Sequence, residues 1–159
     1  MLKKIAGLAA FFILITAGCS KDDICSQDTP TTPLLIITFN DINNPTQRKT
    51  VPGLTVRATI NNQNVVNASS TDSIAIPLPT GADITEYRFI RSTNSEPVSD
   101  FYTFTYVRED VYVNRACAFK TTYTNLTAAG DGTADWIFRV EVNNQTIEDE
   151  TQAHLTFFH

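Results

Sequence analysis

Residues 100–108 read Asp-Phe-Tyr-Thr-Phe-Thr-Tyr-Val-Arg, and this stretch decides the fold class. Aromatic side chains at positions 102, 104 and 106 alternate with threonines at 103 and 105. Successive side chains of a β-strand point to opposite faces, and aromatic and β-branched residues are enriched in strands. The stretch therefore predicts a strand with Tyr102, Phe104 and Tyr106 on one face.

The same period of two recurs on both sides of this stretch. We expect further strands at residues 34–39, 54–60, 74–78, 85–91, 111–116, 117–124, 136–142 and 151–158. Turn-forming residues separate them, and a tight reversal is expected at Arg108-Glu109-Asp110. No segment after the first residues carries a helical period. About eight or nine short strands indicate an all-β fold, an antiparallel β-sandwich of immunoglobulin-like or related type.

Alternation also predicts which side chains share a face. It groups Ile60 with Leu54 and Val56, Phe119 with Tyr123, and Trp136 with Phe138. Most aromatic side chains of a sandwich are core residues. An exposed aromatic surface on such a sandwich would favour binding of glycans by stacking, whereas a flat apolar patch would favour a protein partner.

The N-terminal residues have the anatomy of a secretory signal. Lys3 and Lys4 precede the apolar run of residues 5–15, and two small residues stand before Cys19. The run is about 11 residues long, whereas a membrane-spanning helix needs about 20. A retained membrane helix and an ordinary secreted protein cleaved nearby are the alternatives. The cysteine after Ala-Gly resembles a lipoprotein box, so we expect a lipoprotein signal peptide at residues 1–18 and lipidation of Cys19.

The residues after Cys19 are charged. Ser20, Lys21, Asp22 and Asp23 resemble the export signal that sends Bacteroidota lipoproteins to the outer face of the outer membrane. A solvated tether without a signal is the alternative reading. We expect a lipidated tether and linker at residues 19–33, a single β-sandwich domain at residues 34–159, and a lipid-anchored location on the outer membrane, exposed at the cell surface.

Charge narrows the range of partners. The chain has 12 Lys and Arg against 17 Asp and Glu, and loss of Lys3 and Lys4 with the signal leaves 12 − 2 = 10 basic residues. The mature net charge is then 10 − 17 = −7. An acidic domain without a basic run argues against nucleic acid as a partner. The expected contact with the membrane is through the lipid on Cys19.

Three cysteines occur in the chain, and lipidation would occupy Cys19. Cys25 and Cys117 then form the one possible pair in an oxidising compartment. Two unpaired thiols are the alternative. Their spacing fits no zinc site, because no Cys-x-x-Cys motif or histidine cluster accompanies them.

Catalytic and metal-binding patterns are weak. His154 and His159 are the two histidines, and no Gly-x-Ser-x-Gly elbow supplies a nucleophile for them. We expect His154 on the polar face of the last strand, at the surface. The acids Asp131, Asp135 and Glu148-Asp149-Glu150 fit no EF-hand spacing and are expected in solvated turns. We therefore expect no enzyme, no metal site and no cofactor.

Several segments resemble a family of Bacteroidota lipoproteins of unknown function. They are Asp23-Ile24-Cys25, the Thr-Pro-Thr-Thr-Pro run at residues 29–33, residues 71–74 and the segment at residues 112–120. Ala118 stands where the family segment Arg-Ala-Cys-Gly-Phe-Lys has glycine, a residue typical of a bulge or close approach. The resemblance implies the lipid anchor, the pairing of Cys25 with Cys117 and a single domain. It implies no activity.

These expectations favour a protein that acts by contact. We expect a structural or accessory subunit of a cell-envelope complex that binds an envelope protein. A surface lipoprotein that binds a glycan or another ligand is the second hypothesis.

Overall fold

The computed structural model describes residues 24–93 and 96–159, and within these ranges the regular structure consists of strands. The strands are β1 (Leu35–Asn40), β2 (Val51–Ala58), β3 (Asn64–Thr71), β4 (Ser73–Ile76), β5 (Ile84–Arg91), β6 (Val98–Asn114), β7 (Ala118–Gly130), β8 (Arg139–Val142) and β9 (Leu155–Phe158). The predicted all-β fold and strand number are therefore confirmed.

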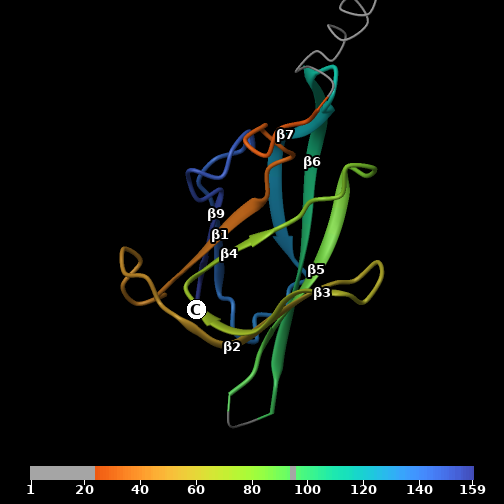
Figure 1. Cartoon of the computed structure of the whole chain (residues 1–159). Coiled ribbons are helices and arrows are strands. Elements are labelled where there is room, and N and C mark those ends of the chain that lie inside the picture. Colours follow the sequence, from red (N-terminus) through yellow and green to blue (C-terminus); the bar gives the residue numbers. More distant parts are fainter. Residues whose placement is uncertain (1–23, 94–95) are drawn as a thin grey trace, which may run out of the picture. The chain divides into compact units, whose positions relative to one another are not determined.

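The strands form two sheets. One has the order β4-β1-β9-β8 and the other has the order β3-β2-β5-β6-β7. In Figure 1, β1, β4 and β9 lie together in one layer, and β5, β6 and β7 lie in the other. The pairs β1–β4, β8–β9, β2–β5 and β5–β6 are antiparallel, whereas β1 runs parallel to β9 with Ile37 opposite Leu155. The fold is a β-sandwich with one parallel strand pair in its smaller sheet.

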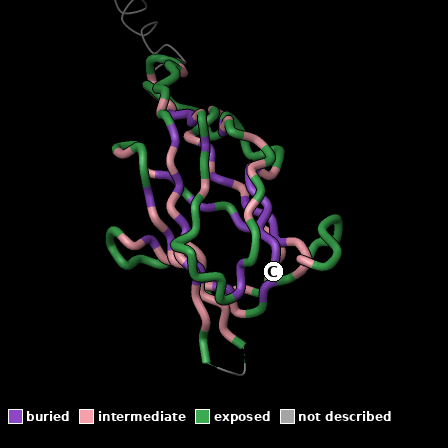
Figure 2. Tube along the Cα trace, turned by 180° about the vertical axis from the view of Figure 1, so that it is seen from behind, coloured by how far each residue is buried: buried purple, intermediate pink, exposed green. Residues whose placement is uncertain are grey.

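The core lies between the sheets. Tyr102, Phe104 and Tyr106 are buried, as the alternation in residues 100–108 predicts. Phe157 of β9 meets the rings of Phe89 and Tyr102 at centroid distances of 5.2 and 4.6 Å. Figure 2 shows buried stretches along the inner strands and exposed residues at the loops. Aromatic packing from both sheets thus closes the sandwich.

The described chain divides into two compact units. The first, which we call the sandwich unit, contains residues 32–110 and 121–159 and includes the whole buried core. The second, which we call the tip unit, contains residues 111–120 and, of the described N-terminal residues, 24–31. It holds the end of β6, the start of β7 and the turn between them.

The expected reversal at residues 108–110 is wrong, because β6 continues to Asn114. Arg108 donates through Nε to Asp83 Oδ1 at 2.6 Å. Asp110 Oδ1 accepts from the Thr121 hydroxyl at 2.8 Å, between adjacent strands. These partners satisfy the charged side chains while the backbone stays extended. A run of charged residues is therefore compatible with a strand here.

The expected common face of Trp136 and Phe138 is also wrong. Trp136 is fully buried, whereas 56% of Phe138 is exposed. Residues 135–137 form no strand, because their backbone amides bind the carboxylate of Asp100. Asp100 Oδ1 accepts from Asp135 N at 2.8 Å, and Oδ2 accepts from Trp136 N and Ile137 N at 3.0 and 2.8 Å. The buried carboxylate fixes this segment, which ends the alternation.

Two further face assignments are corrected. Ile60 is 82% exposed because β2 ends at Ala58, and Asn62 continues the turn with a φ of 57°. Phe119 is 62% exposed, whereas Tyr123 is fully buried. Phe119 packs edge-to-face on Tyr112 instead, with ring centroids 5.4 Å apart. Ile60 lies beyond the end of its strand, and Phe119 lies in the tip unit, outside the buried core that contains Tyr123.

Candidate functional site

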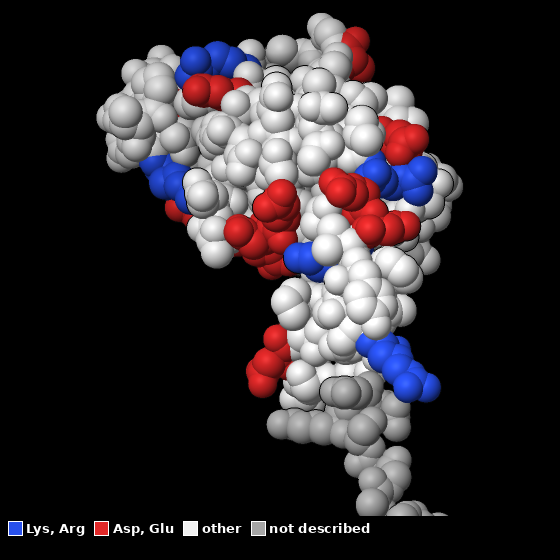
Figure 3. Space-filling view, turned by 90° about the horizontal axis from the view of Figure 1, so that it is seen from above, with Lys and Arg blue, Asp and Glu red and all other residues white. Residues whose placement is uncertain are grey.

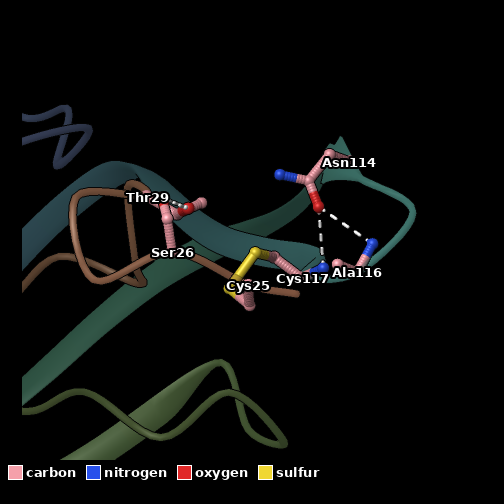
Figure 4. Close-up of a disulfide and its surroundings, with 6 residues drawn as sticks. All are labelled: Cys25, Ser26, Thr29, Asn114, Ala116 and Cys117. Atoms are coloured by element: carbon pink, nitrogen blue, oxygen red, sulfur yellow. Dashed lines mark hydrogen bonds between the residues drawn. A yellow bond between two sulfur atoms is a disulfide. The ribbon is translucent and has the colours of Figure 1, made fainter. Parts of the chain in front are cut away.

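The tip unit contains a disulfide. Cys25 and Cys117 are joined, with Cα atoms 5.0 Å apart (Figure 4). Asn114 shapes the turn before Cys117, because its Oδ1 accepts from Ala116 N at 3.0 Å and Cys117 N at 2.8 Å. Such a side-chain acceptor stabilises a turn by binding the backbone ahead of it. The N-terminal segment is thus covalently fixed to the turn between β6 and β7.

Ala118 has a φ of 58°, in the left-handed region that favours glycine. The family segment that residues 112–120 resemble is expected to have glycine at this position, and glycine adopts this conformation without strain. An L-residue with a Cβ is strained there by roughly 1–2 kcal/mol.

Replacement Ala118→Gly is expected to raise the free energy of unfolding by about 0.5–1 kcal/mol. The relief of strain exceeds the entropy that glycine adds to the unfolded chain. Urea unfolding followed by fluorescence measures this change in the free energy of unfolding. Ala116→Gly is the matched control, because Ala116 is not among the residues with positive φ, and it is expected to lower stability. A loss of stability in Ala118→Gly would contradict the expectation.

The tip unit also exposes apolar side chains. Tyr112 and Phe119 are 59% and 62% exposed although their rings contact each other. Val111 and Ile24 of the same unit are exposed as well. By contrast, Tyr102, Phe104, Tyr106 and Tyr123 of the same two strands are buried. The exposed rings of Tyr112 and Phe119 are therefore the ones on these strands that could contact a partner.

An apolar groove lies on the sandwich unit. It has a volume of about 300 Å³ and its lining residues are Ile60, Pro79, Ala82, Ile84, Thr85, Glu86 and Thr103. A second hollow of about 250 Å³ shares Ile60, Pro79 and Thr85 with it, so the two adjoin. Ile60 and Ile84 are 82% and 58% exposed. Exposed apolar residues gathered at one hollow, with polar side chains beside them, are typical of an interaction surface.

Three tyrosines hold the segment Pro77-Leu78-Pro79, which lines the second hollow and reaches the groove at Pro79. Their hydroxyls donate to its three successive carbonyls: Tyr87 to Pro77, Tyr123 to Leu78 at 2.9 Å, and Tyr106 to Pro79 at 3.3 Å. Burial raises the pKa of each of these hydroxyls, so they remain donors at neutral pH. This segment is thus fixed before any partner binds.

His154 lies in a polar cleft of about 230 Å³, which Asn144, Thr146, Glu148, Asp149 and Gln152 also line. The expected surface position is wrong, because only 2% of His154 is exposed. Its Nδ1 accepts from Ile36 N at 3.0 Å, and the ring also hydrogen-bonds to the Asp149 backbone. A histidine engaged in this way ties β1 to the loop before β9. The cleft has residue types found in catalytic sites, but among the described residues Nδ1 of His154 is engaged by the amide of Ile36 and not by a hydroxyl.

His159 is likewise buried, with 4% exposure, and its ring packs on Phe39 and Trp136. Lys49 Nζ donates to the His159 carbonyl at 2.7 Å. Burial lowers the pKa of both histidines below their ordinary value of 6.5.

Acid is therefore expected to destabilise the fold below about pH 6.5. The unfolded chain takes up protons on His154 and His159 there, whereas the folded chain resists, so stability falls as the pH drops through the folded pKa values. Urea midpoints at pH 7.5 and 5.0 measure the loss. The variant His154→Asn keeps an acceptor for Ile36 N and is expected to show a smaller difference. If the difference between the urea midpoints at pH 7.5 and 5.0 is the same in His154→Asn as in the wild type, protonation of His154 does not contribute to the loss of stability in acid.

The acids considered for calcium lie in turns. Asp131 Oδ1 accepts from the Thr133 amide and hydroxyl, and these bonds lower its pKa. Asp149 Oδ1 accepts from the Thr151 amide and hydroxyl, and Glu150 Oε1 accepts from Leu34 N. Over residues 24–93 and 96–159, no group of three or more His, Cys, Asp or Glu side chains could hold a metal ion.

Charge is dispersed on the face drawn in Figure 3. Lys and Arg side chains there stand apart from one another, and several have acidic neighbours. Among the described residues, no helix is long and apolar enough to cross a membrane. The expected signal peptide at residues 1–18, the lipidation site Cys19 and the export signal at residues 20–23 lie outside the described residues.

The two sheets and the groove define a β-sandwich protein with an apolar groove on its surface. The chain matches the Family of unknown function (DUF6452) over residues 53–159, more than half of its length, and it belongs to this family. The match contains the groove and Cys117 but begins after Cys25. No curated protein and no solved structure matches the chain.

Proposed function

We propose that this protein is a Bacteroidota lipoprotein, anchored to the outer membrane by lipid on Cys19 and exposed at the cell surface. Cysteine usage supports the anchor. The chain has three cysteines, and the disulfide takes Cys25 and Cys117, which leaves Cys19 for the lipid. Two or more acyl chains give stable anchoring, because each buried methylene adds about 0.8 kcal/mol.

The sandwich acts without catalysis, as a structural or accessory subunit that binds a protein of the cell envelope. The observation that carries this proposal is the groove with Ile60 and Ile84 at its rim, exposed by 82% and 58%. A partner that covers these side chains removes apolar surface from water, at about 25 cal/mol per Å². The segment Pro77-Leu78-Pro79, which reaches the groove at Pro79, is held by tyrosine hydrogen bonds, so little ordering is needed on binding.

The test is isolation of the tagged full chain from native membranes in mild detergent. A stoichiometric companion is expected with the wild type and lost in Ile60→Asp/Ile84→Asp. Val107→Asp is the matched control, because Val107 is 52% exposed and does not line the groove. Surface changes of this kind alter stability by about 0.5 kcal/mol or less, so the fold persists. A companion that stays with the double variant, or a solitary protein, would overturn the proposal.

Binding of a glycan or other ligand is the second candidate function. The groove volume of about 300 Å³ lies at the lower end of the range for small-molecule sites, and Glu86 and Thr103 supply polar groups there. A solitary protein whose groove variants lose binding in a glycan screen would favour this candidate.

A further inference from the structure

The tip unit exposes four apolar side chains that the buried core does not use. Tyr112 and Phe119 form a ring pair with centroids 5.4 Å apart. Ile24 is 79% exposed and Val111 is 37% exposed. Isolated apolar residues are common at surfaces, but this short unit exposes four of them, and two of these are in ring contact. We call Ile24, Val111, Tyr112 and Phe119 the apolar tip.

The disulfide limits how far the apolar tip lies from the proposed lipid. Cys25 is bonded to Cys117, two residues before Phe119 and within the same compact unit. Cys19 precedes Cys25 by 25 − 19 = 6 residues. Because an extended chain advances at most 3.3–3.6 Å per residue, Cys25 lies within about 20 Å of the lipidated residue. This distance between Cys25 and Cys19 is smaller than the thickness of the hydrocarbon core of a bilayer, which is about 30 Å.

We propose that the apolar tip seats in the lipid–water interface of the membrane to which the protein is anchored. This inference rests on the proposed lipidation of Cys19. Tyrosine suits such a site, because its ring is apolar and its hydroxyl remains in contact with water and headgroups. Arg115, exposed in the turn of the same unit, can approach lipid phosphates.

Tethering makes this weak contact effective. A surface that is disulfide-bonded to a residue within about 20 Å of the lipidated cysteine meets the bilayer at an effective concentration near the millimolar range, so a few apolar side chains suffice. A protein partner would need a larger surface, since stable interfaces bury about 800 Å² on each side. The lipid interface is therefore the occupant that the anchor and the small number of exposed apolar side chains favour.

The experiment uses tryptophan as a depth probe in the full lipidated chain. The native chain has one tryptophan, Trp136, which is fully buried and gives a constant background. Phe119→Trp introduces a probe at the apolar tip. Phe138→Trp is the matched control, because Phe138 is exposed to a similar extent, 56%, in the sandwich unit. Each variant is reconstituted into vesicles of phosphatidylethanolamine and phosphatidylglycerol, with and without lipids labelled by doxyl quenchers.

The added fluorescence of Phe119→Trp is expected to shift to the blue on reconstitution and to be lost with doxyl lipids, whereas that of Phe138→Trp is expected to persist. Flotation with the vesicles is measured on the same samples. Protein that fails to float overturns the lipid anchor and this inference with it. If the protein floats but the probe at position 119 is not quenched, the membrane contact of the apolar tip is overturned and the lipid anchor stands. Binding of the apolar tip to a protein in place of lipid would give this same result.

Discussion

Replacement Asp100→Ala is expected to lower the free energy of unfolding by about 3–5 kcal/mol. The carboxylate of Asp100 is fully buried and accepts hydrogen bonds from the backbone amides of residues 135, 136 and 137. Alanine leaves these donors without an acceptor, two of them buried, and each unsatisfied buried group costs about 1–3 kcal/mol. Trp136, which these bonds position, loses its fixed place in the core. Urea unfolding followed by the fluorescence of Trp136 measures the effect.

Asp135→Ala is the matched control for Asp100→Ala. Asp135 belongs to the same segment, but its side chain is exposed, so we expect a change of about 0.5 kcal/mol or less. Asp100→Asn keeps one acceptor oxygen and adds donors where donors already converge, so we expect an intermediate loss. A change below about 1 kcal/mol in Asp100→Ala would show that water replaces the carboxylate without penalty.

The double replacement Cys25→Ser/Cys117→Ser is expected to lower the free energy of unfolding by about 4–5 kcal/mol. The disulfide links residues 92 positions apart, and a cross-link of that span restricts the unfolded chain by about this amount in the chain-entropy treatment. Urea unfolding of the variant and of the wild type, each with and without dithiothreitol, measures the loss.

Reduction provides the internal control for this variant. Dithiothreitol is expected to bring the wild type to the stability of Cys25→Ser/Cys117→Ser and to leave the variant unchanged. Replacing both cysteines leaves no unpaired thiol at position 25 or 117. Equal stability of the oxidised wild type and the variant would mean that the unfolded chain is already restricted without the disulfide.

Local alternation predicts the sheet faces well where the pleat is regular. Tyr102, Phe104 and Tyr106 are buried as residues 100–108 indicate, because β6 lies flat on the core there. The pattern fails at Phe138, where the carboxylate of Asp100 binds backbone groups more than thirty positions away in the sequence. The alternation of neighbouring residues carries no information about a contact between segments so far apart in the sequence.

The candidate site is harder to predict than the fold. Ile60 has the strand period, but the strand ends before it, so its exposure depends on where the turn starts. His154 has the polarity of a surface residue, yet its ring accepts a hydrogen bond from Ile36 across the sheet. The cysteine count, by contrast, leaves so few combinations that the disulfide could be predicted.

The parallel pairing of β1 with β9 has a consequence for the order of assembly. These strands are the two central members of the four-stranded sheet, yet they come from opposite ends of the folded sequence. During synthesis or transport that starts from the N-terminal side, β1 keeps an open edge until residues 155–158 arrive. Pairing over such a sequence separation is slow, in the range of milliseconds to seconds for β-proteins. A chain interrupted before β9 therefore exposes an unpaired strand, a target for proteolysis and aggregation.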